Sequence, residues 1–389
     1  MPPLDGRRLW FVGIGGAGLS AYAFLARAWG AEVGGWDRVE TPYLRSLDGV
    51  VIEISPEPVA PPDREVVVST AYAGSVAGRS RAEFLAELVS LRRSIVVSGA
   101  HGKTTTTAMI AFALAELGQD PAWLVGGEVP QLGANAGAGE GWLVVEGDES
   151  DRTIEQLRPE IAVVTNVELD HHATFASEVE VAELYERWLE HVPQVVRGWE
   201  LDPVDVELAV PGEHNRSNAA AALAALELAG VERGDAEGAL SRFRGAGRRF
   251  ELVGEARGVT VVDDYAHHPT EIAAAIAAAR EREPARVLVL FQPHLYSRTR
   301  HLAHDFGVAL SAADAACVTE VYRAREEPVP GVSGKLVLDA LRPGLRAGWA
   351  PTVDDGVRIV RGWAREGDLV LTLGAGDVDR AGPRLLELL

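Results

Sequence analysis

The sequence has little of three things, and each shortage excludes a class of protein. A single cysteine, Cys317, stands in 389 residues, so an internal disulfide and a thiolate metal site are excluded, and a reducing cytoplasm is expected. The longest apolar runs, such as 108–115, are far shorter than the roughly 18 residues of a membrane span, and no apolar signal region opens the chain. The formal net charge of −20 argues against nucleic acid as a partner, because phosphate backbones are bound by dense Lys/Arg surfaces.

Lysine is nearly absent as well. Of the 37 Lys and Arg residues, only Lys103 and Lys335 are lysines. Lys103 lies in the glycine-containing segment SGAHGKTTTT. A compact ammonium fits between adjacent phosphates where a planar guanidinium does not. The use of this rare residue here therefore favours a phosphate site.

Apolar residues, by contrast, are abundant. They make up 47% of the chain, enough for the two or three cores that this length predicts. Strand-like apolar runs alternate with helical ones in three stretches, 1–92, 93–246 and 247–389, which predicts three α/β domains. Strands are expected after Leu9 and at 32–36, 66–69, 95–97, 142–146, 161–165, 259–263, 287–291, 316–319 and 369–373, and helices at 19–29, 179–191 and 217–229.

A glycine-rich bend follows the first strand. Its sequence matches G-x-G-x-x-G, and Asp37 stands nineteen residues after the last glycine, which is the dinucleotide fingerprint. Glycines let the backbone approach a pyrophosphate, and Asp37 would accept a hydrogen bond from a ribose hydroxyl. The bend predicts a phosphorylated nucleotide, NAD or another diphosphate, and the alternative is a tight turn only. The residues concerned are Gly13, Gly15, Gly16, Gly18 and Asp37.

The segment around Lys103 resembles a phosphate-binding loop, but it lacks the first glycine of the usual G-x-x-x-x-G-K-[ST] pattern. The residues available are Gly99, Gly102, Lys103, Thr104 and Thr105. Lys103 would bridge the β- and γ-phosphates of a nucleoside triphosphate, and the Thr104 hydroxyl would bind Mg²⁺. The alternative, a helix capped by threonines, does not explain the lysine.

Polar groups also follow three later apolar segments. Glu146 opens the acidic stretch EGDESD, where a carboxylate is suited to magnesium and the alternative is a solvated acidic turn. His171 and His172 are adjacent, so at most one of them is expected to reach a metal, and a solvated or capping histidine is the alternative. Asn218, in PGEHNRSN, is a further candidate, with a plain helix-start residue as the alternative.

Two segments in the last stretch concentrate titratable groups. DDYAHHPTE contains two carboxylates, a phenol and two imidazoles, more than a helix cap by Asp264 or Thr270 would need. QPHLYSRTR places arginines after a strand, where one of them could hold a carboxylate or phosphate bidentately, although Arg300 could be a plain surface charge. Both segments predict a functional site.

Taken in order, these motifs resemble the Mur ligase family over nearly the whole chain. The segments that carry the resemblance are FVGIGGAGLS, SGAHGKTTTTAM, VVEGDESD, VVTNVELDHH, VPGEHNRSNA, GAGRRFE, VVDDYAHHPTEI, FQPHLYSRTR and LTLGAGDV. The resemblance implies a Rossmann-like N-terminal UDP-binding domain, a central P-loop-type ATPase domain, and a Rossmann-like C-terminal domain that presents the amino acid and closes over the other two.

The resemblance also implies residue roles. The glycine bend would hold a UDP diphosphate. Lys103 and Arg249 would contact ATP phosphates, and the ATP site would also include Asn215, Asn218 and Asp264. Mg²⁺, or Mn²⁺ in its place, would be bound by Thr104, Glu146 and His171. The amino-acid and sugar-nucleotide carboxylate site would be lined by Tyr265, His267, His294 and Arg298. Lys103, Glu146, His171 and Arg249 would be the catalytic set.

The reaction that the resemblance implies joins L-alanine to the lactyl carboxylate of UDP-N-acetylmuramate at the expense of ATP, in the cytoplasm, by a monomer or homodimer with no nucleic-acid or membrane partner. One departure stands out: only twenty-two residues separate Trp188 from Pro211, where relatives carry several dozen more. A ligase that recycles a tripeptide, a dehydrogenase, and an inactive nucleotide-binding protein are the alternatives.

Overall fold

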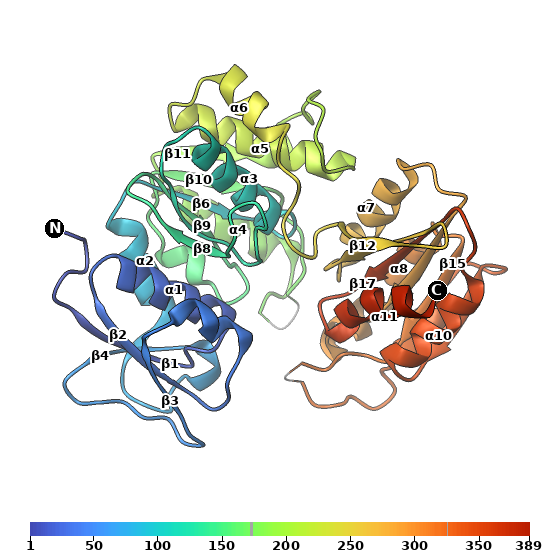
Figure 1. Cartoon of the computed structure of the whole chain (residues 1–389), viewed down its shortest axis with the longest axis horizontal. Helices are drawn as coiled ribbons and strands as arrows, with labels where there is room; N and C mark the ends of the chain where they lie inside the picture. The colour runs from blue at the N-terminus through green and yellow to red at the C-terminus, as the bar shows by residue number, and fades with distance from the viewer. Residues whose placement is uncertain (172–173, 325) are drawn as a thin grey trace. The chain divides into compact units, whose positions relative to one another are not determined.

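The computed structural model describes residues 1–171, 174–324 and 326–389. The chain forms two compact units. Unit 1 comprises Met1–Val167, Val179–Asp202 and Ala219–Phe243, and unit 2 comprises Glu168–Glu178, Pro203–Asn218 and Arg244–Leu389. Three sheets can be followed along the chain in Figure 1, two in unit 1 and one in unit 2.

The first sheet of unit 1 has the strand order β3-β2-β1-β4-β5 and is parallel throughout. Its central strand β1 is a continuous apolar run with Leu9 to Val12 buried, the pattern of a strand covered on both faces. The elements are β1 (Arg8–Val12), α1 (Ala17–Ala28), β2 (Glu32–Asp37), η1 (Pro42–Leu47), β3 (Val51–Ile54), β4 (Glu65–Val68), η2 (Thr70–Tyr72), β5 (Arg79–Ser80) and α2 (Arg81–Ser90).

The second sheet of unit 1 has the order β11-β10-β6-β9-β7-β8. All neighbours are parallel except β7 and β8. The twenty-two residues between Trp188 and Pro211 contain one short strand and one helical turn. The elements are β6 (Ser94–Ser98), α3 (Lys103–Glu116), β7 (Ala122–Leu124), β8 (Ala136–Ala138), β9 (Leu143–Glu146), η3 (Thr153–Gln156), β10 (Ile161–Val164), α4 (Glu178–Leu189), β11 (Gln194–Arg197), η4 (Gly198–Glu200), α5 (Glu213–Leu228) and α6 (Arg233–Leu240).

Unit 2 is built on the third sheet, with the order β12-β13-β17-β14-β15-β16. Only β12 is antiparallel to its neighbour. The pair Phe291 and Phe306 lies in its core, with ring centroids 5.2 Å apart. The elements are β12 (Glu251–Ala256), β13 (Val259–Asp264), α7 (Pro269–Arg280), β14 (Arg286–Phe291), α8 (Tyr296–Leu310), β15 (Ala315–Thr319), α9 (Gly334–Asp339), β16 (Arg346–Ala350), α10 (Val353–Trp363), β17 (Asp368–Leu373), η5 (Asp377–Arg380) and α11 (Ala381–Leu388).

The expected three-domain α/β class is confirmed, and every expected strand is present within a residue or two of its predicted bounds. The expected helix at 217–229 starts four residues earlier, at Glu213. Asn218 therefore lies inside α5, so its interpretation as a helix-start residue is wrong. The N-cap position of α7 is His268, so neither Asp264 nor Thr270 occupies it. Within the described residues, no helix is both long and apolar enough to cross a membrane.

The packing of α2 on the first sheet gives a stability prediction. Phe84 is 0% exposed and meets the Phe11 ring edge-on at 5.4 Å. The substitution Phe84→Ala leaves a cavity there and should cost about 3–5 kcal/mol of unfolding free energy. Val51→Ala is the control, because Val51 on edge strand β3 is 68% exposed and should change stability by less than about 0.5 kcal/mol. Denaturant unfolding measures both, and equal losses would contradict the packing described.

Candidate active site

The predicted site residues gather where parallel strands end. The glycine bend follows β1, the Lys103 loop follows β6, Glu146 ends β9, and His294 lies just after β14. Ligands of open α/β sheets bind at the carboxyl ends of strands, because helix N-termini and loops converge there. The three sheets thus offer one such edge each.

At the first edge, Asp37 holds the glycine bend in place. Its Oδ2 accepts a hydrogen bond from the backbone N–H of Gly15 at 2.8 Å, and its Oδ1 accepts one from Arg38 at 2.7 Å. The side chain is buried. The carboxylate thus fixes the backbone of the bend, and the hydrogen bond predicted from a ribose hydroxyl to Asp37 stays a prediction.

The bend also needs its first glycine. Gly13 has φ +88°, and a Cβ there would lie 2.4 Å from the Ser69 hydroxyl oxygen. Gly16 is the N-cap of α1, and Gly18 lies in that helix's first turn, where the first backbone N–H groups have no partner within the helix. The N–H groups of residues 13–16 are themselves bonded within the protein, so the donors that fit a diphosphate at this edge are those of the first turn of α1.

Arg81 is a cation at this edge that the sequence motifs did not reveal. Its Nη1 lies 3.5 Å from the position of a Cβ on Gly18, and its Nη2 lies 3.4 Å from Asp151 and 3.7 Å from Asp148. Its Nε is buried without a hydrogen-bond partner among the residues described. Arg81 thus stands between the glycine bend and the acidic stretch after β9.

At the second edge, the loop Gly99–Gly102 is clamped by the end of β10. The Asn166 side chain accepts from the His101 N–H and donates to the His101 carbonyl, both at 2.9 Å. The Thr165 hydroxyl donates to the same carbonyl at 2.5 Å. Gly99 has φ +133°, and a Cβ there would lie 2.1 Å from Thr165 Oγ1. Only glycine fits at position 99.

Lys103 begins α3, and its ammonium turns back onto this loop. Nζ donates to the Gly99 carbonyl at 2.6 Å and to the Ala100 carbonyl at 3.1 Å, and it pairs with Glu149 at 3.1 Å. Burial, the largest single effect, acts to lower the pKa of Lys103, but the charges of Glu149, Asp148 and Glu146 outweigh it, and the pKa is raised. Lys103 is therefore fully cationic at neutral pH, as a phosphate ligand must be.

Thr104 and Glu146 form a pair of oxygen ligands beside the loop. The Thr104 hydroxyl donates to Glu146 Oε1 at 3.0 Å, and Glu146 Oε2 accepts from the Gly126 N–H at 2.7 Å. A hydroxyl and a carboxylate are hard oxygen donors of the kind that Mg²⁺ prefers. The residues present therefore fit the predicted magnesium site. Thr105, the next residue of α3, is buried.

In unit 2, the buried side-chain amides of Asn215 and Asn218 are hydrogen-bonded to each other on α5. Asn215 Nδ2 donates to the Pro211 carbonyl at 2.6 Å, and Asn218 Nδ2 donates to Asn215 Oδ1 at 3.4 Å. Each amide is therefore held in one orientation. An oriented amide can recognise the donor and acceptor edge of a base, and its place at an adenine stays a prediction.

Arg249 projects from a turn that Asp264 holds. Its neighbours Arg248 and Phe250 both have left-handed backbones, with φ of +57° and +51°. Asp264 accepts from the N–H groups of Phe250 and Ala266, both at 2.7 Å, and burial raises its pKa to about 6. Asp264 thus fixes this turn, and its predicted place at ATP stays a prediction.

The four residues predicted for the acceptor site lie together at the third edge. The rings of Tyr265 and His267 are 5.2 Å apart, those of His267 and His294 are 6.1 Å apart, and Arg298 Nη1 lies 3.3 Å from His294 Nδ1. The Arg249 guanidinium lies 5.0 Å from the centre of the Tyr265 ring. Their roles stay a prediction, but the grouping is a fact of the fold.

Both imidazoles of this cluster are held neutral. Burial is the main cause that lowers the pKa of His267 to about 4, and the charge of Arg298 adds to it against Glu271 and Asp170. Burial also lowers the pKa of His294 to about 3, with His267 and Arg298 adding to the effect. Groups this acidic are poor proton acceptors at neutral pH. They are suited to hydrogen bonding rather than to base catalysis.

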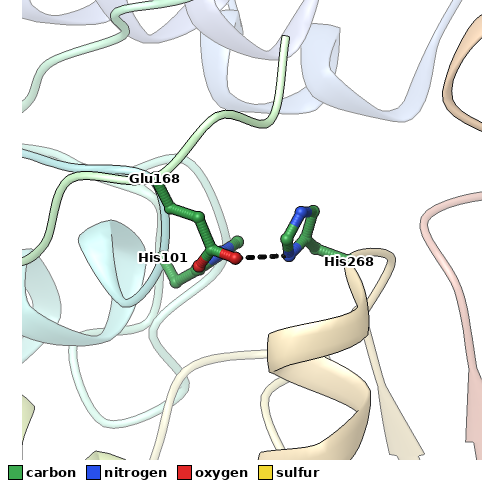
Figure 2. A group of neighbouring side chains, drawn as sticks. All are labelled: His101, Glu168 and His268. Atoms are coloured by element: carbon green, nitrogen blue, oxygen red, sulfur yellow. Dashed lines mark ion pairs between the residues drawn. The ribbon is translucent and has the colours of Figure 1, made fainter. Parts of the chain in front are cut away.

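The segment Glu168–Glu178 carries His171 and belongs to unit 2. The His171 imidazole pairs with Asp170 at 3.6 Å, whereas Thr104 and Glu146 belong to unit 1. That all three bind one metal ion stays a prediction. His172 lies outside the described residues. Figure 2 shows the Glu168 carboxylate directed toward the His268 ring, 3.6 Å away.

Two protein-family models match the chain. One, described as the Mur ligase middle domain, matches residues 97–196, and the other, described as the Mur ligase glutamate ligase domain, matches residues 248–376. The two matches lie in the second and third predicted domains, and each contains one complete group of the residues described above.

Curated relatives match almost from end to end. The UDP-N-acetylmuramate–L-alanine ligase of Streptomyces coelicolor is 40% identical over 97% of this chain and 96% of its own, and that of Rubrobacter xylanophilus is 40% identical over 98% and 100%. The solved UDP-N-acetylmuramate–alanine ligase of Thermotoga maritima superposes with a TM-score of 0.81 at 27% identity, covering 98% of both chains.

The match to the Streptomyces coelicolor enzyme runs over 445 residues, and this chain has 389. That relative therefore carries at least 56 residues, the difference between the two lengths, that have no counterpart here. A shortened chain is thereby confirmed, and its location between Trp188 and Pro211 stays a prediction.

The clamped loop predicts a defect in nucleotide binding. Gly99→Ala drives a Cβ into Thr165 and should weaken ATP binding at least about tenfold, because the loop N–H groups lose their arrangement. Gly118→Ala, at the far end of α3, is the matched control: Gly118 also has a positive φ, +71°, but open space around it. Calorimetric titration with ATP and Mg²⁺ measures both, and equal affinities would contradict the role of the loop.

The neutral imidazoles predict a pH dependence of stability. The pKa of both His267 and His294 lies below the ordinary histidine value in the folded protein, so the unfolded chain takes up protons first as the pH falls. Their contribution is present above about pH 6.5 and is lost progressively toward about 4 for His267 and about 3 for His294. The double variant His267→Asn/His294→Asn should show a smaller fall in Tm between about pH 7 and about pH 5 than the wild type. The same fall in both would show that these groups titrate normally.

Proposed function

Because this chain belongs to the Mur ligase family, we propose that it is an ATP-dependent ligase that joins L-alanine to the lactyl carboxylate of UDP-N-acetylmuramate. The observation that carries the proposal is the near-complete match to curated ligases of that name, at about 40% identity, in a chain that retains the Lys103, Thr104 and Glu146 arrangement. The reaction would supply a peptidoglycan precursor in the cytoplasm, where ATP and nucleotide sugars are available.

Electrostatic repulsion between the two negatively charged reactants is the main obstacle to the proposed reaction. The lactyl carboxylate attacks the γ-phosphorus of ATP, the bond to the β,γ-bridging oxygen breaks, and ADP leaves behind an acyl phosphate. Two anions must approach each other, which is unfavourable unless cations lie beside them. Lys103 and Arg249 are the protein cations assigned to this task, and they act by position and charge.

Magnesium fits this proposal through its oxygen ligands. Thr104 and Glu146 would hold the ion, with His171 as a further ligand, and the bound ion would neutralise phosphate charge. Mn²⁺ prefers the same ligands. The metal preference is open to direct measurement by activity in either ion.

In the second half-reaction the neutral amine of L-alanine attacks the acyl carbon. The tetrahedral intermediate loses phosphate, the nitrogen loses a proton, and an amide is formed. Tyr265, His267 and His294 would line the acceptor site as hydrogen-bonding groups, since both imidazoles are neutral. The acidity of these imidazoles argues against either of them as the group that takes the amine proton.

Lys103 gives the sharpest test of the ATP chemistry. Lys103→Ala should lower kcat on the order of 10²-fold or more, the loss typical of one preorganised transition-state donor. The matched control is Lys335→Ala, since Lys335, the other lysine of the chain, lies on the Trp349 ring in unit 2. Phosphate release measures the turnover of both variants, and near-wild-type turnover by Lys103→Ala would contradict the role of Lys103 in ATP chemistry.

The acceptor is identified in the same assay. Phosphate release that needs both UDP-N-acetylmuramate and L-alanine, with a product heavier by one alanyl residue, supports the proposal. Release with a recycled tripeptide only would move the function to the recycling ligase, and release with D-glutamate only would place the chain elsewhere in the family. ATP binding without release for any acceptor would mean that the shortened chain has lost the chemistry.

A further inference from the structure

The guanidinium of Arg298 is already bound on two sides. Nε donates to Asp170 Oδ1 at 2.8 Å, and Nη2 lies 2.7 Å from the same oxygen. Nη1 lies 3.3 Å from His294 Nδ1. The side chains of Arg298 and Asp170 are each only 4% exposed. All three nitrogens of Arg298 are thus engaged by neighbouring side chains.

This arrangement fixes the tautomer of His294. A guanidinium can only donate, so His294 Nδ1 must accept. The low pKa of His294 keeps its ring neutral, and the single proton therefore lies on Nε2. His294 can therefore donate a hydrogen bond to a ligand through Nε2–H. Arg298 determines this tautomer by donating to Nδ1.

The other oxygen of Asp170 faces two imidazoles. Oδ2 lies 3.8 Å from His267 Nε2 and 3.6 Å from His171 Nε2. Two residues earlier in the same segment, Glu168 accepts a hydrogen bond from the Thr270 hydroxyl at 2.8 Å and pairs with His268 (Figure 2). The segment that carries His171 is therefore bound to the starts of both α7 and α8.

We propose that Asp170 and Arg298 are positioning residues of the ligase: their buried ion pair orients His294 toward the acceptor and holds the segment that carries His171. The inference rests on the proposed function for the identity of the acceptor. It adds to the sequence-based interpretation, in which Arg298 lines the amino-acid and sugar-nucleotide carboxylate site.

The physical basis is the cost of breaking a buried pair. Removing one partner leaves the other charge buried and unpaired, so the surrounding groups must rearrange. Small displacements of groups that position a substrate are costly, and about 1 Å can change a rate 10²-fold. The effect of losing Asp170 should therefore appear at the acceptor site, through Arg298 and His294.

The kinetic test uses three variants. Asp170→Asn and Arg298→Lys should each raise the KM for L-alanine on the order of 10- to 100-fold, with a smaller change in the KM for ATP. The double variant should be no worse than the more impaired single variant, because both changes break one unit. The Mg²⁺ concentration for half-maximal rate should also rise, since the segment carrying His171 loosens.

The matched control is a second ion pair of unit 2 whose carboxylate is buried. Arg286 at the start of β14 pairs with Asp368 at the start of β17 at 2.6 Å, and the Asp368 side chain is 1% exposed. These residues lie at the amino ends of their strands, away from the cluster. Asp368→Asn should lower Tm as Asp170→Asn does, but leave the KM for L-alanine unchanged.

A second readout does not depend on turnover. The ¹⁵N shifts of the imidazole nitrogens in the whole protein report the tautomer of each ring. Wild type and Asp368→Asn should show His294 protonated on Nε2 alone, whereas Asp170→Asn should show a mixture of tautomers. These spectra also confirm that each variant is folded.

The outcomes separate the inference from the proposed function. A raised KM with Arg298→Lys but not with Asp170→Asn would mean that Arg298 binds the acceptor directly, and the inference would be overturned. An unchanged KM for L-alanine together with unchanged ¹⁵N shifts of His294 in Asp170→Asn would also overturn the inference. The Asp170–Arg298 pair would then contribute to stability only. No L-alanine-dependent release by the wild type would refute the proposed function, and the imidazole shifts would still decide whether Asp170 orients His294.

Discussion

A buried charge needs an opposite charge or hydrogen-bond partners beside it, and the arrangement at each strand edge follows from this constraint. Removing an ion from water costs several kcal/mol unless close partners replace the hydration shell. Lys103 meets the requirement with Glu149 and two loop carbonyls, and Arg298 meets it with Asp170. These pairings also fix where each cation stands. The groups that hold the site residues in place are therefore the same groups that make their burial tolerable.

Local spacing carried most of what the sequence could predict. The two glycine loops are recognisable because a strand, a bend and a helix follow within about fifteen residues, and the steric demands at Gly13 and Gly99 leave no alternative to glycine. The DDYAHHPTE segment was recognisable for the same reason, as several titratable groups stand next to one another. The three strand edges follow from the α/β alternation.

Partners distant in sequence could not be predicted. Glu149 stands 46 residues from Lys103, and Asp170 stands 128 residues from Arg298. No periodicity connects such pairs, because sheet topology brings them together. Asp37 and Asp264 show a related limit: the motifs singled out both residues, but only the fold reveals that their carboxylates accept hydrogen bonds from backbone N–H groups. Arg81 begins α2 with no motif around it, and only the packing of α2 places it beside Gly18.

The pairings also bear on how a shortened chain could keep its chemistry. Each group of site residues is fixed by contacts within its own unit: Asn166 clamps the Lys103 loop, Gly126 fixes Glu146, and Asp264 holds the turn of Arg249. None of these clamps involves the residues between Trp188 and Pro211. The second sheet has six strands in the described chain, with β10 and β6 paired in parallel along their length. Preorganisation of this kind depends on the residues that surround the side chain, not on the length of the domain. The loss of at least 56 residues relative to a curated relative therefore leaves the described supports of the phosphate loop and of the acceptor cluster in place.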